Sequence, residues 1–180
     1  MTQLALSAIG RDRPGIVAEV TRALLGHSLN ITDSQMAVLG GRFTMMLIVD
    51  APEATDLDLV REELVSTSER LGLDALSLSA LAEAADAPAA DPSHIVTVYG
   101  VDHPGIVAGV SQILAEAGCS IVDINQTVVQ GKFAMVIIAN TSRSQSSVTE
   151  LKERFRIEGE KLGVRIYAQR EDLFNAMHRI

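Results

Sequence analysis

Cysteine, tryptophan and long apolar segments are scarce or missing in this chain of 180 residues. Cys119 is the single cysteine, and there is no tryptophan. One cysteine excludes an internal disulfide, which fits a reducing compartment. No stretch reaches about 18 apolar residues without a Gly, a Pro or a charge, and Met1 to Ile9 lacks the basic start of a signal peptide. We therefore expect a cytoplasmic protein that does not span a membrane.

Positive charge is also scarce. Lys and Arg number 15 against 23 Asp and Glu, the formal net charge is −8, and no run of basic residues forms a patch. Because a DNA duplex repels an acidic protein that lacks a dense basic face, we expect no direct binding to nucleic acid. The four histidines show no metal-ligand spacing, and glycine-rich nucleotide motifs are absent, so neither a metal nor a cofactor is expected.

A repeated segment is the most informative feature that is present. Gly10 to Val20 reads GRDRPGIVAEV, and Gly100 to Val110 reads GVDHPGIVAGV. At the offset of 100 − 10 = 90, residues 4–50 align with residues 94–140 without a gap, and roughly sixteen pairs are identical. The chain therefore carries one small structural unit twice, with two equivalent loops.

Each copy has the hydrophobic patterning of a βαββαβ unit. This order predicts an α+β, ferredoxin-like fold, in which an antiparallel sheet carries both helices on one face. In the first copy we expect strands at Gln3–Ile9, Leu29–Leu39, Arg42–Asp50 and Leu73–Leu81, a hairpin turn at Gly40-Gly41, and a helix with Pro14 in its first turn. We also expect a second helix that opens at the acidic segment Glu53 to Asp58 and is ended by Gly72. The second copy repeats the pattern, with its hairpin turn at Gln130-Gly131, through Leu162 and a last strand at Val164–Gln169.

The duplication sets the expected domain boundaries. Residues 1–82 form the first domain, residues 83–93 form a polar linker rich in Ala, Asp and Pro, and residues 94–180 form the second domain. The second domain ends in an extension, Glu171 to Ile180, with the apolar spacing of a short amphipathic helix. The first copy has no counterpart of this extension.

The third strand of each copy is apolar on both of its faces. Phe43 and Met45 alternate with Thr44 and Met46, and the same holds around Phe133. A sheet that has helices on one side only is expected to be polar on the other side. We therefore expect another sheet or subunit to cover the helix-free face, which makes the chain a homo-oligomer.

The loop after each first strand can bind a small ligand. A strand followed by Asp-x-Pro-Gly and a helix leaves backbone N–H groups unpaired at the positive end of the helix dipole, where a carboxylate is stabilised. Asp12 and Asp102 can accept hydrogen bonds from a ligand ammonium group, and Gly15 and Gly105 allow a close approach to the backbone. Together these features suit a zwitterion.

A simpler interpretation of the same loops stays open at this point. An Asp just before a helix most often accepts hydrogen bonds from the N–H groups of its own helix, and Pro-Gly often only makes a tight helix entry. The four residues Asp-x-Pro-Gly are a weak motif when they stand alone. Their recurrence in both copies favours the ligand hypothesis.

The two loops, with Leu29-Asn30-Ile31 in one copy and Ser120-Ile121 in the other, resemble ACT domains. Tandem pairs of this length resemble the glycine cleavage system transcriptional repressor family, and the ending from Gln169 to Ile180 is similar to that of small stand-alone ACT proteins. The resemblance implies domains that pair edge to edge and bind an amino acid at the interface. It also implies a regulator, without enzymatic activity, that senses an amino acid such as glycine or serine and controls a protein partner.

The resemblance also assigns contact residues. Asp12 and Asp102 fall where relatives that sense amino acids carry Asn or Asp, and Asn30 and Ser120 fall on a second polar contact position. The ligand-binding residues implied in this way are Asp12, Pro14, Gly15, Ile16, Val17 and Asn30 in the first copy, and Asp102, Pro104, Gly105, Ile106, Val107 and Ser120 in the second.

Two other classes of function stay open. A ferredoxin-like hydrolase of the acylphosphatase kind would use Arg13 to hold a phosphate, although His103 replaces it in the second copy. An assembly module would use its sheets only to oligomerise. Cys119 is expected to be a packed thiol, and the repeated Asp33 and Asp123 are expected to face solvent. His103 can tune ligand binding with pH, but an exposed loop histidine is the simpler expectation.

Overall fold

The computed structural model describes residues 1–82 and 93–170. The chain separates into two compact units, one in each half, and each is described by itself. The predicted linker, apart from Ser93, and the predicted C-terminal helix at Glu171–Ile180 lie outside the described residues. No helix in the described part of the chain is long and apolar enough to cross a membrane.

Both units have the predicted element order. The first consists of β1 (Thr2–Arg11), α1 (Ile16–Gly26), β2 (Asn30–Leu39), β3 (Arg42–Ala51), α2 (Leu57–Leu71) and β4 (Leu73–Ala80). The second consists of β5 (Ser93–Val101), α3 (Ile106–Glu116), β6 (Ser120–Val129), β7 (Lys132–Asn140), α4 (Val148–Leu162) and β8 (Val164–Arg170). The hairpin turns at Gly40-Gly41 and Gln130-Gly131 are confirmed.

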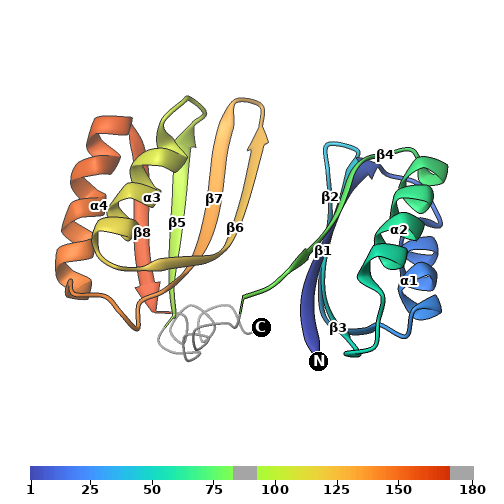
Figure 1. Cartoon of the computed structure of the whole chain (residues 1–180). Coiled ribbons are helices and arrows are strands. Elements are labelled where there is room, and N and C mark those ends of the chain that lie inside the picture. Colours follow the sequence, from blue (N-terminus) through green and yellow to red (C-terminus); the bar gives the residue numbers. More distant parts are fainter. Residues whose placement is uncertain (83–92, 171–180) are drawn as a thin grey trace, which may run out of the picture. The chain divides into compact units, whose positions relative to one another are not determined.

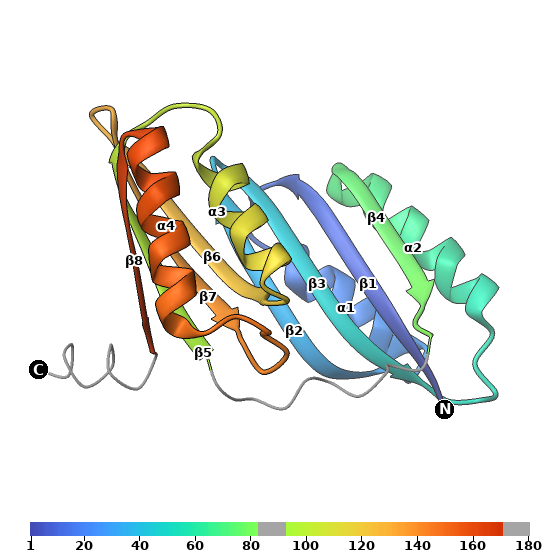
Figure 2. The same cartoon turned by 90° about the vertical axis from the view of Figure 1, so that its left-hand side faces the viewer.

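Each unit is a four-stranded antiparallel sheet with two helices on one face (Figure 1). The strand orders are β2-β3-β1-β4 and β6-β7-β5-β8, so the first strand of each unit is central and the second is an edge. In Figure 2 the helices α3 and α4 lie in front of the second sheet. The predicted ferredoxin-like α+β fold is therefore confirmed in both copies.

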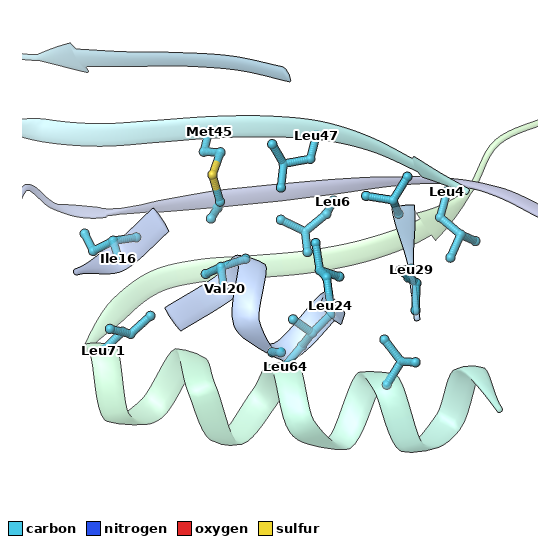
Figure 3. Close-up of a cluster of buried hydrophobic side chains, with 14 of the residues drawn as sticks. Leu4, Leu6, Ile16, Val20, Leu24, Leu29, Met45, Leu47, Leu64 and Leu71 are labelled. Carbon is cyan, nitrogen blue, oxygen red and sulfur yellow. The ribbon is translucent and has the colours of Figure 1, made fainter. Parts of the chain in front are cut away.

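The core of the first unit lies between the sheet and its two helices. Figure 3 shows side chains from β1, β3, α1 and α2 pointing into this layer. They include Leu6, Leu24 and Leu47, each at most 1% exposed, and Leu64 at 2%. Burial of a leucine of this kind stabilises the fold by roughly 1.5–3 kcal/mol. The helical stripe predicted from the sequence is the face that enters the core.

The edge strands are exposed along their whole length. Every residue of β6 is exposed, and β2 is exposed except for Ala37, which is partly buried. Apolar residues of β2 and β6 lie on the same side of the sheet as the helices, yet Met36 is 44% exposed and Val38 is 55% exposed. An unpaired, partly apolar edge is a surface on which another strand can pair.

The first helix of each unit begins later than expected. The prediction put Pro14 in the first turn, but α1 begins at Ile16, and α3 begins at Ile106. The Pro-Gly pair forms a turn before each helix. The reason is the conformation of the glycine, because a positive φ cannot continue into a right-handed helix.

Candidate functional site

The candidate site in each unit is the loop between its first strand and first helix. We call residues Asp12–Gly15 and Asp102–Gly105 the Pro-Gly loops. Gly15 has φ 97° and ψ −13°, and Gly105 has φ 102° and ψ −17°. Residues with a Cβ rarely adopt this left-handed region. The two loops therefore share one conformation, and glycine is the residue that permits it.

The N-termini of both helices are without side-chain caps. Gly15 and Gly105 are the N-cap residues, and no side chain accepts a hydrogen bond from the first helical N–H groups. The simpler interpretation of Asp12 and Asp102 as ordinary caps is therefore wrong. The carboxylates leave the amides at the positive end of each helix free to meet another acceptor.

Backbone hydrogen bonds fix which amides are available. The first donor within α1 is Glu19 N–H, which binds Gly15 O at 2.9 Å, and Gly109 N–H binds Gly105 O at the same distance in α3. The N–H groups of the three preceding residues in each helix have no partner within the helix. Each Pro-Gly loop therefore presents a short row of donors.

The residues implied as contacts do not all present side chains to the loop surface. Asp12, Pro14 and Gly15 are exposed, as are Asp102, Pro104 and Gly105. Ile16 and Ile106 are each 1% exposed and lie in the hydrophobic cores. These two residues can therefore contribute to a ligand only through their backbone. Val17 is partly buried, and Val107 is 36% exposed.

The start of each loop is tied to the neighbouring hairpin. The backbone N–H of Asp12 donates to Gly41 O at 3.2 Å, and that of Asp102 donates to Gly131 O at 3.0 Å. The hairpins β2–β3 and β6–β7 thus hold the two aspartates at the same end of their sheets. The carboxylates themselves are exposed at that end.

The residue after each aspartate ties its loop to the end of the second helix. In the first unit, Arg13 Nη2 donates to the carbonyl of Arg70 at 3.1 Å, near the C-terminus of α2. In the second unit, His103 Nε2 lies 2.6 Å from the carbonyl of Leu162, the last residue of α4. A cation is stabilised at this negative end of a helix dipole. The sequence pattern gave no signal for these contacts.

His103 is a more constrained residue than the simple expectation of an exposed loop histidine. Its Nδ1 lies 2.9 Å from Pro104 O, in addition to the Leu162 contact of Nε2. Carbonyl oxygens only accept, so both ring nitrogens donate at once only when the imidazole is protonated. The backbone hydrogen bonds to Pro104 and Leu162 raise the pKa of His103 above its ordinary value, and the Asp102 charge adds to this effect.

The second set of implied contacts lies far from the loops within each unit. The Pro-Gly loop of the first unit follows Arg11, which pairs with Arg42, and Arg42 in turn pairs with Leu39 at the end of β2. Asn30, at the start of β2, pairs with Asp50 at the opposite end of the sheet. Nine steps along β2 at about 3.3 Å each separate Asn30 from Leu39 by about 30 Å. Ser120 opens β6 in the same way. One unit alone therefore does not bring Asn30 to its own Pro-Gly loop.

The first turn of the helix after each loop differs between the two units. Glu19 lies in the first turn of α1, where it binds Arg22 and Arg70, while Gly109 occupies the same place in α3. The hydrogen bond from Arg22 lowers the pKa of Glu19, so this carboxylate is charged at neutral pH. The second unit has a carboxylate here from a different element, because a Cβ built on Gly109 would lie 2.9 Å from Glu158 Oε1 on α4.

The remaining candidates show no catalytic arrangement. Cys119 is buried, as expected of a packed thiol, and Asp33 and Asp123 are exposed on the edge strands. His27 Nε2 pairs with the Glu63 carboxylate at 2.8 Å. No group of His, Cys, Asp and Glu that could hold a metal ion occurs among residues 1–82 and 93–170.

Two ferredoxin-like units, each with a Pro-Gly loop at a helix start, define a tandem pair of small domains of one type. The sequence model of the ACT domain family matches residues 2–76 and again residues 94–169. This chain belongs to the ACT domain family. The resemblance inferred from the two loops is confirmed in both halves.

The chain is similar to shorter proteins of one group. A UPF0237 protein of Methanopyrus kandleri is 49% identical over 86 residues, which are 48% of this chain and 96% of that protein. A UPF0237 protein of Listeria innocua is 44% identical over 86 residues, or 48% of this chain and 97% of that protein. These relatives have the length of one unit, so this chain contains the equivalent of two.

Two solved structures match nearly the whole chain. An unknown protein from Galdieria sulphuraria has a TM-score of 0.73 and 29% identity, and the match covers 94% of this chain and 98% of that one. A candidate glycine cleavage system transcriptional repressor has a TM-score of 0.72 and 22% identity, covering 94% and 96%. The second likeness shows the tandem fold alone.

Proposed function

We propose that this protein is a regulator, not an enzyme, that senses a small amino acid at its Pro-Gly loops. The observation that supports this most directly is the pair of helix N-termini without side-chain caps, each beside an exposed aspartate. The amides bind the ligand carboxylate, and Asp12 or Asp102 binds its ammonium group. The glycine or serine class fits because the loops offer polar groups and little apolar surface.

Strand pairing completes the site in this proposal. An antiparallel partner of β2 runs in the opposite direction, so the start of the partner strand lies beside the end of β2. That arrangement brings an Asn30 from a second copy of the chain to the end of the sheet that carries Asp12. It also covers the exposed apolar residues of the edge, such as Val38. The site then forms only in the oligomer.

The regulatory output of this proposal goes to a protein. The net charge of −8 disfavours direct contact with DNA, so control of transcription, including that of glycine cleavage, acts through a bound activator or enzyme. The ligand changes this interaction by binding two conformations of the protein with different affinities. The proposed location of these events is the cytoplasm.

Isothermal titration calorimetry of the full chain with the common amino acids tests the proposal. We expect heat of binding from glycine, serine or a close relative, and its loss in Asp12→Ala or Asp102→Ala. Asp58→Ala is the matched control, because Asp58 is an exposed carboxylate in the same unit as Asp12 and pairs with Arg61 on α2. Heat that survives both loop substitutions would place the ligand elsewhere.

The same experiment separates the alternatives. An assembly module gives no heat with any amino acid, yet still oligomerises. An acylphosphatase would hydrolyse acyl phosphates and would need Arg13 to reach a phosphate in the loop, but the Arg13 guanidinium donates to the carbonyl of Arg70. Turnover of acetyl phosphate that disappears in Arg13→Gln would replace the sensor hypothesis.

A further inference from the structure

A groove of about 780 Å³ lies on the second unit, next to its β6–β7 hairpin. It opens on the helix-free face of the sheet, where Tyr99 of β5 is exposed. The strand partners of Tyr99, Ala134 and Arg165, lie on the same face. Val101, the next residue of β5 on this face, pairs with Lys132. The lining consists of Tyr99, Gly100, Val101, Thr127, Val129, Gln130, Lys132, Phe133, Ala134, Gly163 and Arg165.

The first unit shows what the corresponding positions do. Arg42 opens β3 as Lys132 opens β7, and the second residue is Asp74 in β4 and Arg165 in β8. The register differs at these second residues: Ala75 pairs with Ile9 and Leu73 with Gly10, so Asp74 lies at an irregularity of β4, whereas Arg165 pairs with Tyr99. In the first unit these two side chains form an ion pair, with Arg42 Nη1 2.5 Å from Asp74 Oδ2. In the first unit, the side chains of Arg42 and Asp74 therefore reach one another across β1.

In the second unit both positions carry positive charge. The acidic residue that neutralises Arg42 at the start of β4 has no acidic counterpart in β8, whose second residue is the cation Arg165. Neither Lys132 nor Arg165 forms an ion pair with a described residue, and the lining of the groove contains no Asp or Glu. This is a local positive field on a protein whose net charge is −8. Two cations that line one groove are best stabilised by a shared anion.

We propose that this groove binds a small oxyanion, a phosphate or a carboxylate, that is attached to a planar or apolar group. The Arg165 guanidinium binds two oxygens of the anion through its planar fork, and the Lys132 ammonium binds as a point charge. Tyr99, which is 50% exposed, offers its ring to the rest of the ligand. Thr127 and Gln130 add neutral hydrogen-bonding groups at the hairpin side.

This groove is separate from the proposed amino-acid site. Its lining includes Gly100 and Val101, which precede the second Pro-Gly loop, but none of the loop residues themselves. The first unit has no equivalent binding site, because the Arg42–Asp74 pair neutralises it. Failure of this proposal therefore leaves the amino-acid sensor hypothesis intact.

Nitrogen-15 NMR titration of the full chain with phenyl phosphate, benzoate and inorganic phosphate tests the proposal. We expect saturable shifts of the Tyr99, Val101 and Gly163 amides with at least one of the two ring-bearing probes. Inorganic phosphate binds at the same place but more weakly, because it has no group to contact Tyr99. Comparison of phenyl phosphate with benzoate at equal concentration identifies the preferred oxyanion.

Two variants make the test specific to the groove. Arg165→Asp replaces one of the two cations of the groove with a carboxylate that repels an anion, and lowers affinity for the better probe by about tenfold or more. Arg143→Asp makes the same change of charge in the β7–α4 loop, at the other end of β7 from Lys132, and leaves the affinity unchanged. Arg143 is exposed and forms no ion pair with a described residue.

Two results would support the proposed anion site, and two would overturn it. Saturation at the groove with selective loss in Arg165→Asp supports the site, and a weaker loss in Lys132→Gln supports the shared role of the two cations. Absence of shifts with all three probes overturns the proposal. An equal loss in Arg143→Asp also overturns it, because that result reports only general attraction of anions. Thermal melts of each variant confirm that the second unit is folded.

Discussion

The conformation of Gly15 gives a quantitative prediction for the first Pro-Gly loop. Gly15 has φ 97°, and a Cβ built on it would meet no atom within 4 Å. Gly15→Ala therefore causes no steric clash, and its cost is only the strain of an L-residue at positive φ, about 1–2 kcal/mol. The added Cβ also restricts the unfolded chain, which returns about 0.4–1 kcal/mol.

Gly26→Ala is the matched control in the same unit. Gly26 is the last residue of α1, lies outside the positive-φ region, and also has open space where a Cβ would be. Because both variants share the gain from the unfolded state, the difference between them isolates the strain at Gly15. We expect Gly26→Ala to be stabilising by about 0.5–1 kcal/mol, and Gly15→Ala to be less stable than Gly26→Ala by about 1–2 kcal/mol.

Urea unfolding of the full chain, followed at amide resonances of the first unit, measures this difference. With a slope of about 2 kcal/mol/M, the two midpoints differ by about 0.5–1 M. Equal midpoints for Gly15→Ala and Gly26→Ala would refute the positive φ at Gly15, and with it the shape of the loop. Because the loop holds the proposed ligand, Gly15→Ala also weakens amino-acid binding at the first site.

Three further predictions concern other parts of the two units. Because the pKa of His103 is raised, its contribution to stability is fully present below the ordinary pKa of 6.5 and is lost as pH rises through the raised pKa. The difference in melting temperature between wild type and His103→Gln should therefore shrink over that pH range. A difference that is independent of pH would contradict the protonated ring. An Ala at position 100 would place its Cβ 2.5 Å from Val164 Cγ1. Gly100→Ala should therefore destabilise the second unit by about 1–3 kcal/mol, as measured by urea titration. The double variant with Val164→Ala should recover part of this loss. If the edge strands pair, Val38→Lys should shift the chain toward monomer in light scattering. Val65→Lys is the control, because Val65 lies on a helix and is exposed to nearly the same degree, and it should not change the oligomeric state. Equal effects of the two substitutions would show that β2 does not form the interface.

The fold was predictable because its signals are local and occur twice. The hairpin glycines at Gly40-Gly41 and the helical stripe that contains Leu24 each act over a few residues, and both reappear in the second copy. Errors are confined to element ends, where the geometry of a single residue decides. The later start of α1 is of this kind, because the positive φ of Gly15 outweighs the preference of Pro14 for a first helical turn.

The site was predictable only in part because its contacts join distant residues. The sequence identifies Asp12 and its loop, but the contact of Arg13 with Arg70 joins residues 57 positions apart and depends on how α2 ends beside the loop. The place of Asn30 depends on the strand register, which puts it at the far end of the sheet. No pattern of spacing in the chain contains that information.

The differences between the two copies are as informative as their identity. The gapless alignment ends at residue 140, and beyond it the offset becomes 163 − 72 = 91, as the glycines that end α2 and α4 show. At the start of the strand that follows, the first unit has the Arg42–Asp74 ion pair, whereas the second unit has Lys132 and Arg165 and no acidic residue in the groove that they line. The changes from Arg13 to His103 and from Glu19 to Gly109 are two further differences. All of these differences lie at the end of a sheet or helix that carries a Pro-Gly loop. Since the two cores keep the same fold, we propose from the divergence at this end that the two units respond to different ligands.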